Sequence, residues 1–229
     1  MKIPYGYRTE DIDYLTLPPI KTFCKENGLG TNLNREDLLN QIEEFSEKSD
    51  INEIKVKKWL DETLKIGIKT CLVSKVYLEQ KFNLSNIEKI IKKDFSNCPN
   101  SYVCIEEGGT NPKLVNYKII QTNGLLEGVE FSFLISLIKA KSTYSSSGIK
   151  INYPIFVDVD FNNGFIVSRG KSTSLLFKIS EGLEIDPKLS TKPEALIREC
   201  MSKVMQTLKM KEADTGTGKS IIKRTVFNI

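Results

Sequence analysis

The stretch that decides the fold is YPIFVDVDFNNGFIVSRG, residues 153–170, where two apolar runs flank an Asn-Gly pair. Apolar residues on both sides of Asn163-Gly164 are the strongest short-range signal of a β-hairpin. Because side chains alternate across a strand, Asp158 and Asp160 are expected to share one face. The stretch therefore predicts antiparallel β-structure at the centre of the chain.

Further β-rich runs surround this hairpin from about Ser101 onward, and the turn signals at 108–112 and Asn123-Gly124 separate them. The Ser-rich stretch 142–148 predicts a surface loop. Helical patterns lie on both sides of this β-rich part. The sequence therefore predicts an α+β fold with a helical N-terminal third, an antiparallel β-rich middle and a C-terminal helix.

We divide the chain into four segments on this basis. Residues 1–48 are expected to form a small helical module, and residues 49–97 a lysine-rich helical region. Residues 98–185 are expected to form a β-rich domain, and residues 186–229 a C-terminal helix and tail.

Two helices are predicted in the first segment from apolar spacing and terminal residues. One is expected over residues 19–27, with Gly28 as its stop. The second is expected to begin after Asn34, which is a good N-cap with Asp37 three residues later.

The later helices are less uniform in their signals. Ser85 followed by Glu88 matches a capping box at the start of one helix. Residues 71–82, CLVSKVYLEQKF, leave helix and strand open. A stripe of apolar residues predicts the C-terminal helix: Ala195, Leu196, Cys200, Val204 and Leu208.

The composition excludes several classes of site. The chain has 229 residues, a net charge of +4 and no histidine, so serine or cysteine triads that use histidine are absent, as are histidine metal sites. Five cysteines lack a C-x-x-C pair, which favours reduced, mostly buried thiols in a cytosolic protein. We predict no catalytic residues, no metal site and no cofactor.

No segment resembles a signal peptide or a membrane span. The longest apolar run, VEFSFLISLI at residues 129–138, is far shorter than the roughly 20 residues that a membrane helix needs. We therefore expect a soluble, cytoplasmic protein with no membrane partner.

Residues 17–45 resemble the SAP family, a helix-extension-helix module that commonly binds DNA. The resemblance follows the order of features: an apolar first helix, then KENGL at 25–29, a polar turn with Thr31, and REDLL at 35–39. It implies a small helical module that contacts DNA. The chain departs from the family pattern at Leu33, where the family usually has glycine, and at Asn34 and Gln41, where it often has a basic residue.

The distribution of charge indicates that some of the nucleic-acid contacts lie outside the SAP-like residues 17–45. Residues 17–48 hold four cations against six anions, and phosphate binding depends on clustered cations. Residues 51–94 hold ten lysines against six acidic residues. The basic, hydroxyl-rich stretch 169–174 predicts a turn that can hold a phosphate. The candidate nucleic-acid-binding residues are Lys21, Lys25, Arg35, Lys57, Lys58, Arg169 and Lys171.

Two other patterns were weighed as catalytic motifs. ADTGTGKS at 213–220 fits a loose P-loop pattern, but no buried strand precedes it and only nine residues follow it, so a flexible polar loop is favoured. Asp158 and Asp160 on one strand face are a possible Mg²⁺ pair, although the solvent face of a hairpin is the commoner reason for such spacing.

The sequence therefore predicts a non-catalytic, nucleic-acid-associated adaptor or accessory subunit of a larger complex, with DNA favoured over RNA. One alternative is a Mg²⁺-dependent nuclease that uses Asp158 and Asp160. Another is a protein-interaction scaffold with no nucleic-acid role. The bias towards Lys, Asn and Ile suggests an AT-rich genome, and phage defence or mobile-element biology is a hypothesis built on that bias.

Overall fold

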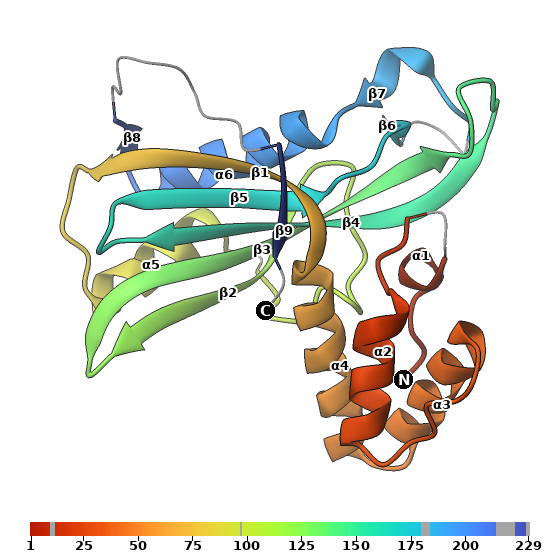
Figure 1. Ribbon diagram of the computed structural model, residues 1–229. Coiled ribbons are helices and arrows are strands. Elements are labelled where there is room, and N and C mark those ends of the chain that lie inside the picture. Colours follow the sequence, from red (N-terminus) through yellow and green to blue (C-terminus); the bar gives the residue numbers. More distant parts are fainter. Residues whose placement is uncertain (10–11, 97, 180–183, 214–222, 228–229) are drawn as a thin grey trace.

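The computed structural model describes residues 1–9, 12–96, 98–179, 184–213 and 223–227, and it has the predicted α+β fold (Figure 1). The helices are α1 (Tyr5–Arg8), α2 (Leu17–Glu26), α3 (Arg35–Glu47), α4 (Asp50–Lys65), α5 (Leu84–Asp94) and α6 (Pro193–Thr207), with the short 3-10 helix η1 (Pro187–Leu189). The strands are β1 (Gly67–Leu78), β2 (Lys113–Thr122), β3 (Leu125–Ala140), β4 (Gly148–Asp160), β5 (Phe165–Lys171), β6 (Leu176–Lys178), β7 (Ser190–Thr191), β8 (Met210–Glu212) and β9 (Lys223–Phe227).

One curved antiparallel sheet organises the molecule. Its main path runs β7-β6-β3-β4-β5-β1-β8, with β2 paired to β3 and β9 paired to β1. The long strands β3 and β4 stay paired from Gly128 opposite Asp160 to Ala140 opposite Gly148. Because β3 is longer than its other partners, it pairs with β2 over its first part and with β6 near its end.

The hairpin predicted around Asn163-Gly164 is confirmed. β4 and β5 pair from Asp160 opposite Phe165, and Gly164 has a φ of +67°, a left-handed conformation that favours glycine. The Asp160 carboxylate accepts a hydrogen bond from the backbone N–H of Asn163 at 2.9 Å, which fastens the turn. This turn holds β5 against β4 in the register that the site described below requires.

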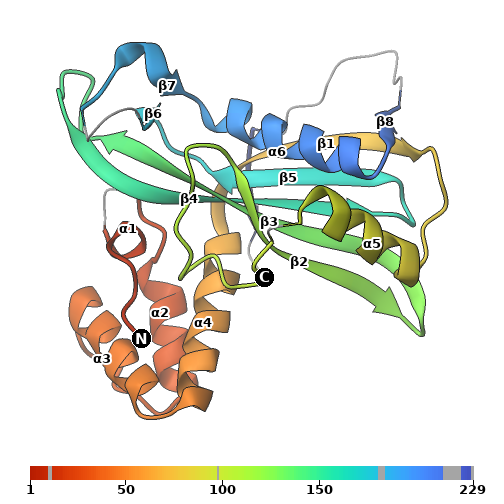
Figure 2. The same ribbon diagram turned by 180° about the vertical axis from the view of Figure 1, so that it is seen from behind.

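The sheet has two different faces because its side chains alternate. On one face, Tyr153, Ile155 and Val157 of β4 are buried beneath α5 and α6 (Figure 2). The Ser168 hydroxyl on β5 donates to the carbonyl of Ile197 on α6 at 3.0 Å. The predicted α6 stripe is buried except at Ala195, which is exposed, and Ile197 and Met201 complete it.

Helices α1 to α4 form what we call the helical corner, which lies below the sheet in both views (Figures 1 and 2). The Tyr7 hydroxyl donates to the carbonyl of Val103 at 2.9 Å. The Asp61 carboxylate accepts from the N–H groups of Val103 and Cys104 at 3.2 and 3.1 Å. These bonds fix the corner to the segment that leads into β2.

Residues 67–78 form strand β1, which resolves the ambiguity between helix and strand. α4 ends at Lys65, and Gly67 has a φ of +88°, so the chain turns there from helix into strand. Cys71, Leu72 and Val76 are buried between the neighbouring elements. β1 therefore belongs to the sheet, although it lies inside the region predicted to be lysine-rich and helical.

The predicted caps are half right. Asn34 caps α3 as expected, accepting from the N–H of Asp37 at 2.9 Å. Ser85 is not a cap; it lies inside α5, whose N-cap is Asn83. Asn83 and Asn86 form a capping box with reciprocal bonds of 2.8 and 2.9 Å. Like Ser85, Asn83 has a side-chain oxygen that can accept a hydrogen bond from a backbone N–H, and the helix begins after Asn83.

In the residues that the structure describes, none of the helices combines the length and apolarity that crossing a membrane requires. All five cysteines are free thiols, and four of them are buried.

We expect Asn83→Ala to lower the free energy of unfolding by about 1 kcal/mol, because it removes the side-chain acceptor at the start of α5. Ser85→Ala is the matched control and should leave stability nearly unchanged. Urea-induced unfolding of both variants measures the difference. An equal loss in the two variants would contradict the assignment of the cap.

Candidate functional site

The seven predicted nucleic-acid-binding residues fall into two groups. Lys21 and Lys25 on α2 and Lys58 on α4 are exposed. In the described part of the chain, none of these three has an ion-pair partner. The other four are held by contacts within the protein: Arg35, Lys57, Arg169 and Lys171.

Arg35, the first residue of α3, bonds to α1 and to the segment between α1 and α2. Its guanidinium donates to the carbonyl of Leu15 at 2.9 Å and to that of Arg8 at 2.6 Å. Lys57 is likewise engaged, because its ammonium lies 2.6 Å from the carboxylate of Glu53 one helical turn away. These two cations therefore have structural partners.

Arg169 and Lys171 lie at the end of strand β5, so residues 169–171 are not the exposed turn that the sequence predicted. The Arg169 guanidinium lies 2.8 Å from the Asp158 carboxylate on the neighbouring strand. The Lys171 ammonium donates to the carbonyl of Asp13 at 2.7 Å. Arg169 is thus held across the β4–β5 hairpin, and Lys171 is held by a residue that is distant in the sequence.

The sheet face opposite α5 and α6 carries a row of charges, and we call it the charged face. Glu130 on β3 is directly opposite Asp158 on β4, and Arg169 comes from β5. Lys65, at the end of α4, approaches from below with its ammonium 3.1 Å from the Glu130 carboxylate. Burial raises the pKa of Asp158, and the positive charge of Arg169 opposes that rise.

A cavity of about 450 Å³ lies over this face. The residues that line it include the acidic residues Glu127, Glu130, Asp158 and Asp160 together with Arg169. Two of these acidic residues are held in ion pairs, Asp158 with Arg169 and Glu130 with Lys65, and such pairing leaves less charge for an outside ligand.

Asp158 and Asp160 each have a partner within the protein. Asp158 pairs with Arg169, and Asp160 bonds to the backbone and side-chain nitrogens of Asn163 at 2.9 and 2.7 Å. Within the described residues, no three Asp, Glu or Cys side chains are grouped so that they could hold a metal ion. The two aspartates therefore act first as structural anchors of the β4–β5 hairpin.

Lys69 is the site residue that the sequence reasoning missed. Only 1% of it is exposed, and its ammonium donates to the carbonyl of Leu64 at 2.5 Å, near the C-terminal end of α4. Burial, together with the nearby positive charges of Lys171 and Arg169, lowers the pKa of Lys69 to about 7. The one signal in the sequence was a lysine within the apolar run of β1.

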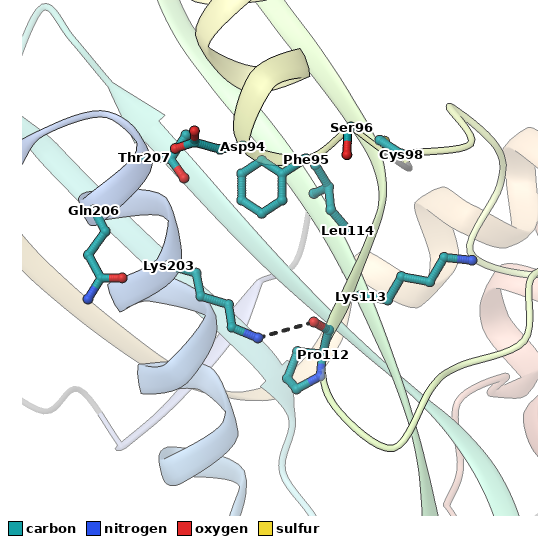
Figure 3. Close-up of a pocket in the computed structure, with 10 residues that line it drawn as sticks. All are labelled: Asp94, Phe95, Ser96, Cys98, Pro112, Lys113, Leu114, Lys203, Gln206 and Thr207. Carbon is teal, nitrogen blue, oxygen red and sulfur yellow. Dashed lines mark hydrogen bonds between the residues drawn. The ribbon is translucent and has the colours of Figure 1, made fainter.

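A second cavity, of about 570 Å³, lies between the end of α5, the start of β2 and α6 (Figure 3). The ring of Phe95 stands at its centre, and the Lys203 ammonium donates to the carbonyl of Pro112 at 3.3 Å. Lys203 also pairs with Glu199 at 3.2 Å, and Lys113 points away from the cavity towards its own partner, Glu106. The cations that border this cavity are therefore also neutralised.

The P-loop-like string at 213–220 lies outside the described residues except for Ala213. Comparison of the chain with protein-family models and with curated protein sequences found no match.

Lys69 predicts a specific dependence of stability on pH. Its pKa in the folded protein, about 7, lies below the ordinary lysine value of 10.5, so in this interval the unfolded chain binds the proton more tightly. The free energy of unfolding should therefore rise from about pH 7 to about pH 8.5, by on the order of 1 kcal/mol. Below about pH 7 both states carry the proton, and this contribution stays constant.

Unfolding at several pH values tests this, with Lys69→Met as the variant that removes the titrating group. The pH slope should be smaller in Lys69→Met and unchanged in the control Lys75→Met, which alters an exposed lysine of the same strand. The measurements stop at about pH 8.5. At higher pH the buried thiols, whose pKa values are raised by burial, lower the free energy of unfolding as the pH rises, because they ionise first in the unfolded chain. A wild-type slope that persists in Lys69→Met would contradict the assignment.

Proposed function

We propose that this protein is a non-catalytic, nucleic-acid-associated adaptor or accessory subunit, with DNA favoured over RNA. The observation that carries the proposal is the division among its cations. Lys65 and Arg169 at the charged face are held in ion pairs, whereas Lys21, Lys25 and Lys58 are exposed on α2 and α4. Free surface cations are the groups that attract phosphates and release counterions.

The helices that carry these lysines are neighbours. The rings of Phe23 on α2 and Trp59 on α4 lie 4.7 Å apart, which packs the two helices together. α3 is less suited to a phosphate backbone, because it exposes acidic residues: Glu36, Asp37, Glu44 and Glu47. If residues 17–45 act as a SAP-like module, the contact is therefore expected from α2, with support from α4.

The cellular setting is part of the same proposal. Five free thiols suit a reducing compartment, which supports a cytoplasmic protein. A role in phage defence or mobile-element biology stays a hypothesis that rests on composition.

We expect binding to duplex DNA to weaken steeply between about 50 mM and about 200 mM salt, because phosphate contacts release counterions. The triple variant Lys21→Glu, Lys25→Glu, Lys58→Glu should weaken binding by at least about tenfold and lower the salt slope by about 3. Fluorescence anisotropy with labelled duplex and single-stranded DNA measures both quantities.

The control is Lys81→Glu, Lys89→Glu, Lys93→Glu, which changes the net charge equally at exposed positions around and on α5. An equal loss of affinity in the two triple variants would assign the binding to net charge alone. If the wild-type protein does not bind DNA at low salt, the result would favour the alternative hypothesis of a protein-interaction scaffold with no nucleic-acid role.

A nuclease that uses Asp158 and Asp160 is the second candidate, because four carboxylates line the cavity on the charged face. We expect no cleavage of DNA or RNA with Mg²⁺ or Mn²⁺, since both aspartates already have protein partners. Gel analysis of incubated substrates checks this. Metal-dependent cleavage that is lost in Asp158→Asn, with the fold retained, would replace the adaptor by the nuclease.

A further inference from the structure

Strand β2 forms a long outer edge of the sheet. It pairs with β3 on one side, and no strand among the described residues lies on its other side. By contrast, the outer side of β1 is occupied in part by β8 and β9, and that of β6 by β7. A long unpaired edge presents a row of N–H and C=O groups that can pair with a strand from another chain.

The bonding of β3 determines which groups of β2 point outward. The carbonyl of Glu127 accepts from the N–H of Phe161, which follows β4, so odd-numbered residues of β3 bond towards β4. Even-numbered residues of β3 therefore bond towards β2, and the register makes Lys118 one of their partners. Tyr117 and Ile119 consequently direct their backbone N–H and C=O groups away from the sheet.

This part of the edge is open and regular. The carbonyl of Val115 accepts from the N–H of Ser101 at 3.2 Å, so the start of the strand is covered. Beyond that point, no hydrogen bond within the described chain reaches the outward N–H groups of Tyr117 and Ile119. Register shifts lie before Asn116 and after Ile120, and the pairing between them is regular.

The side chains of β2 determine which residue types would suit a strand added along this edge. Tyr117 and Ile119 are half-buried against the core on the α5 side of the sheet, whereas Lys118 is exposed on the charged face. A strand added beside β2 would place alternate residues next to these two surfaces. Apolar residues suit the first surface, and carboxylates suit the second.

Charge favours an acidic partner over a second copy of this chain. β2 contains Lys113 and Lys118 and no carboxylate, and the neighbouring helix α5 adds three lysines against two acidic residues. Pairing β2 with its own copy would bring like charges together, which destabilises adjacent strands. A strand that places carboxylates on the charged face gains from the exposed Lys118.

We propose that the β2 edge at Tyr117–Ile119 binds an extended segment of a partner protein, in which apolar and acidic residues alternate, by adding it to the sheet as a further strand. The inference rests on the accessory-subunit part of the proposed function and is independent of the lysines assigned to DNA. Backbone hydrogen bonds supply affinity in this mode, and the alternating side chains supply selectivity.

The probe is a labelled peptide of about ten residues in which Val and Glu alternate, with a peptide of the same composition but blocked order as its control. We expect the alternating peptide to bind and to slow hydrogen exchange at the amides of Tyr117 and Ile119. In the free protein these two amides should exchange faster than that of Lys118, which bonds to β3.

Ile119→Pro removes one outward N–H and leaves the bonds to β3 intact, whereas Ile119→Ala keeps that N–H and loses the side chain. The proline variant should bind at least about tenfold more weakly than the alanine variant. Lys118→Glu provides an independent variant if Ile119→Pro does not fold, and it should also weaken binding of the acidic peptide. DNA affinity should stay unchanged in all three, so failure of this inference and failure of DNA binding are distinguishable.

Several results would overturn the proposal. One is that the alternating peptide binds no better than the blocked one, and another is that Ile119→Pro and Ile119→Ala bind it equally. A third is that sedimentation shows concentration-dependent dimers that Ile119→Pro abolishes, which would assign the edge to a second copy of the chain.

Discussion

The long pairing of β3 with β4 is the constraint on which the rest of the structure depends. It places Glu130 opposite Asp158, and it directs Val157 and Val159 to the opposite face beneath α5 and α6. A slip of one residue would turn every side chain of β4 over, burying carboxylates under the helices and exposing valines. The helices and the charged face are therefore two consequences of one register.

Several charged residues of the sheet bond to neighbouring strands or to the end of α4. Lys65 joins α4 to Glu130, Arg169 joins β5 to Asp158, and Lys69 bonds to the carbonyl of Leu64. The Lys65–Glu130 pair links elements 65 residues apart in the chain, and loss of one partner in any of these contacts would leave a poorly hydrated charge or polar group behind. Such a network favours a structural role for the charged face, and for that reason the proposed binding surfaces lie on the helical corner and on β2.

The parts of the fold that local sequence determines were predictable. Asn34 caps α3, and Asn163-Gly164 closes the β4–β5 hairpin, because both depend on residues within one turn. Ser85 was a wrong cap because Asn83, with the same capacity, lies two residues earlier. Local rules rank capping residues, but they do not choose between two adequate ones.

The candidate site was less predictable because its partners are distant in the sequence. Lys171 was interpreted as an exposed cation, yet it bonds to Asp13 at the other end of the chain. Lys69 carried no local motif, and its burial follows from the packing of β1 within the sheet. Charge counts along a sequence show where cations occur, whereas the fold decides which of them face water.

The position of β1 also determines the order in which the protein can be assembled on the ribosome. β1 pairs with β5, so Lys69 meets Lys171 only after about a hundred more residues have been made. Until then the apolar residues of β1 have no strand to cover them, while the α2–α4 part of the corner can already pack locally. The sequence order therefore leaves β1 without its β5 partner during this part of synthesis, and an unpaired apolar strand is the kind of segment that chaperones protect from aggregation.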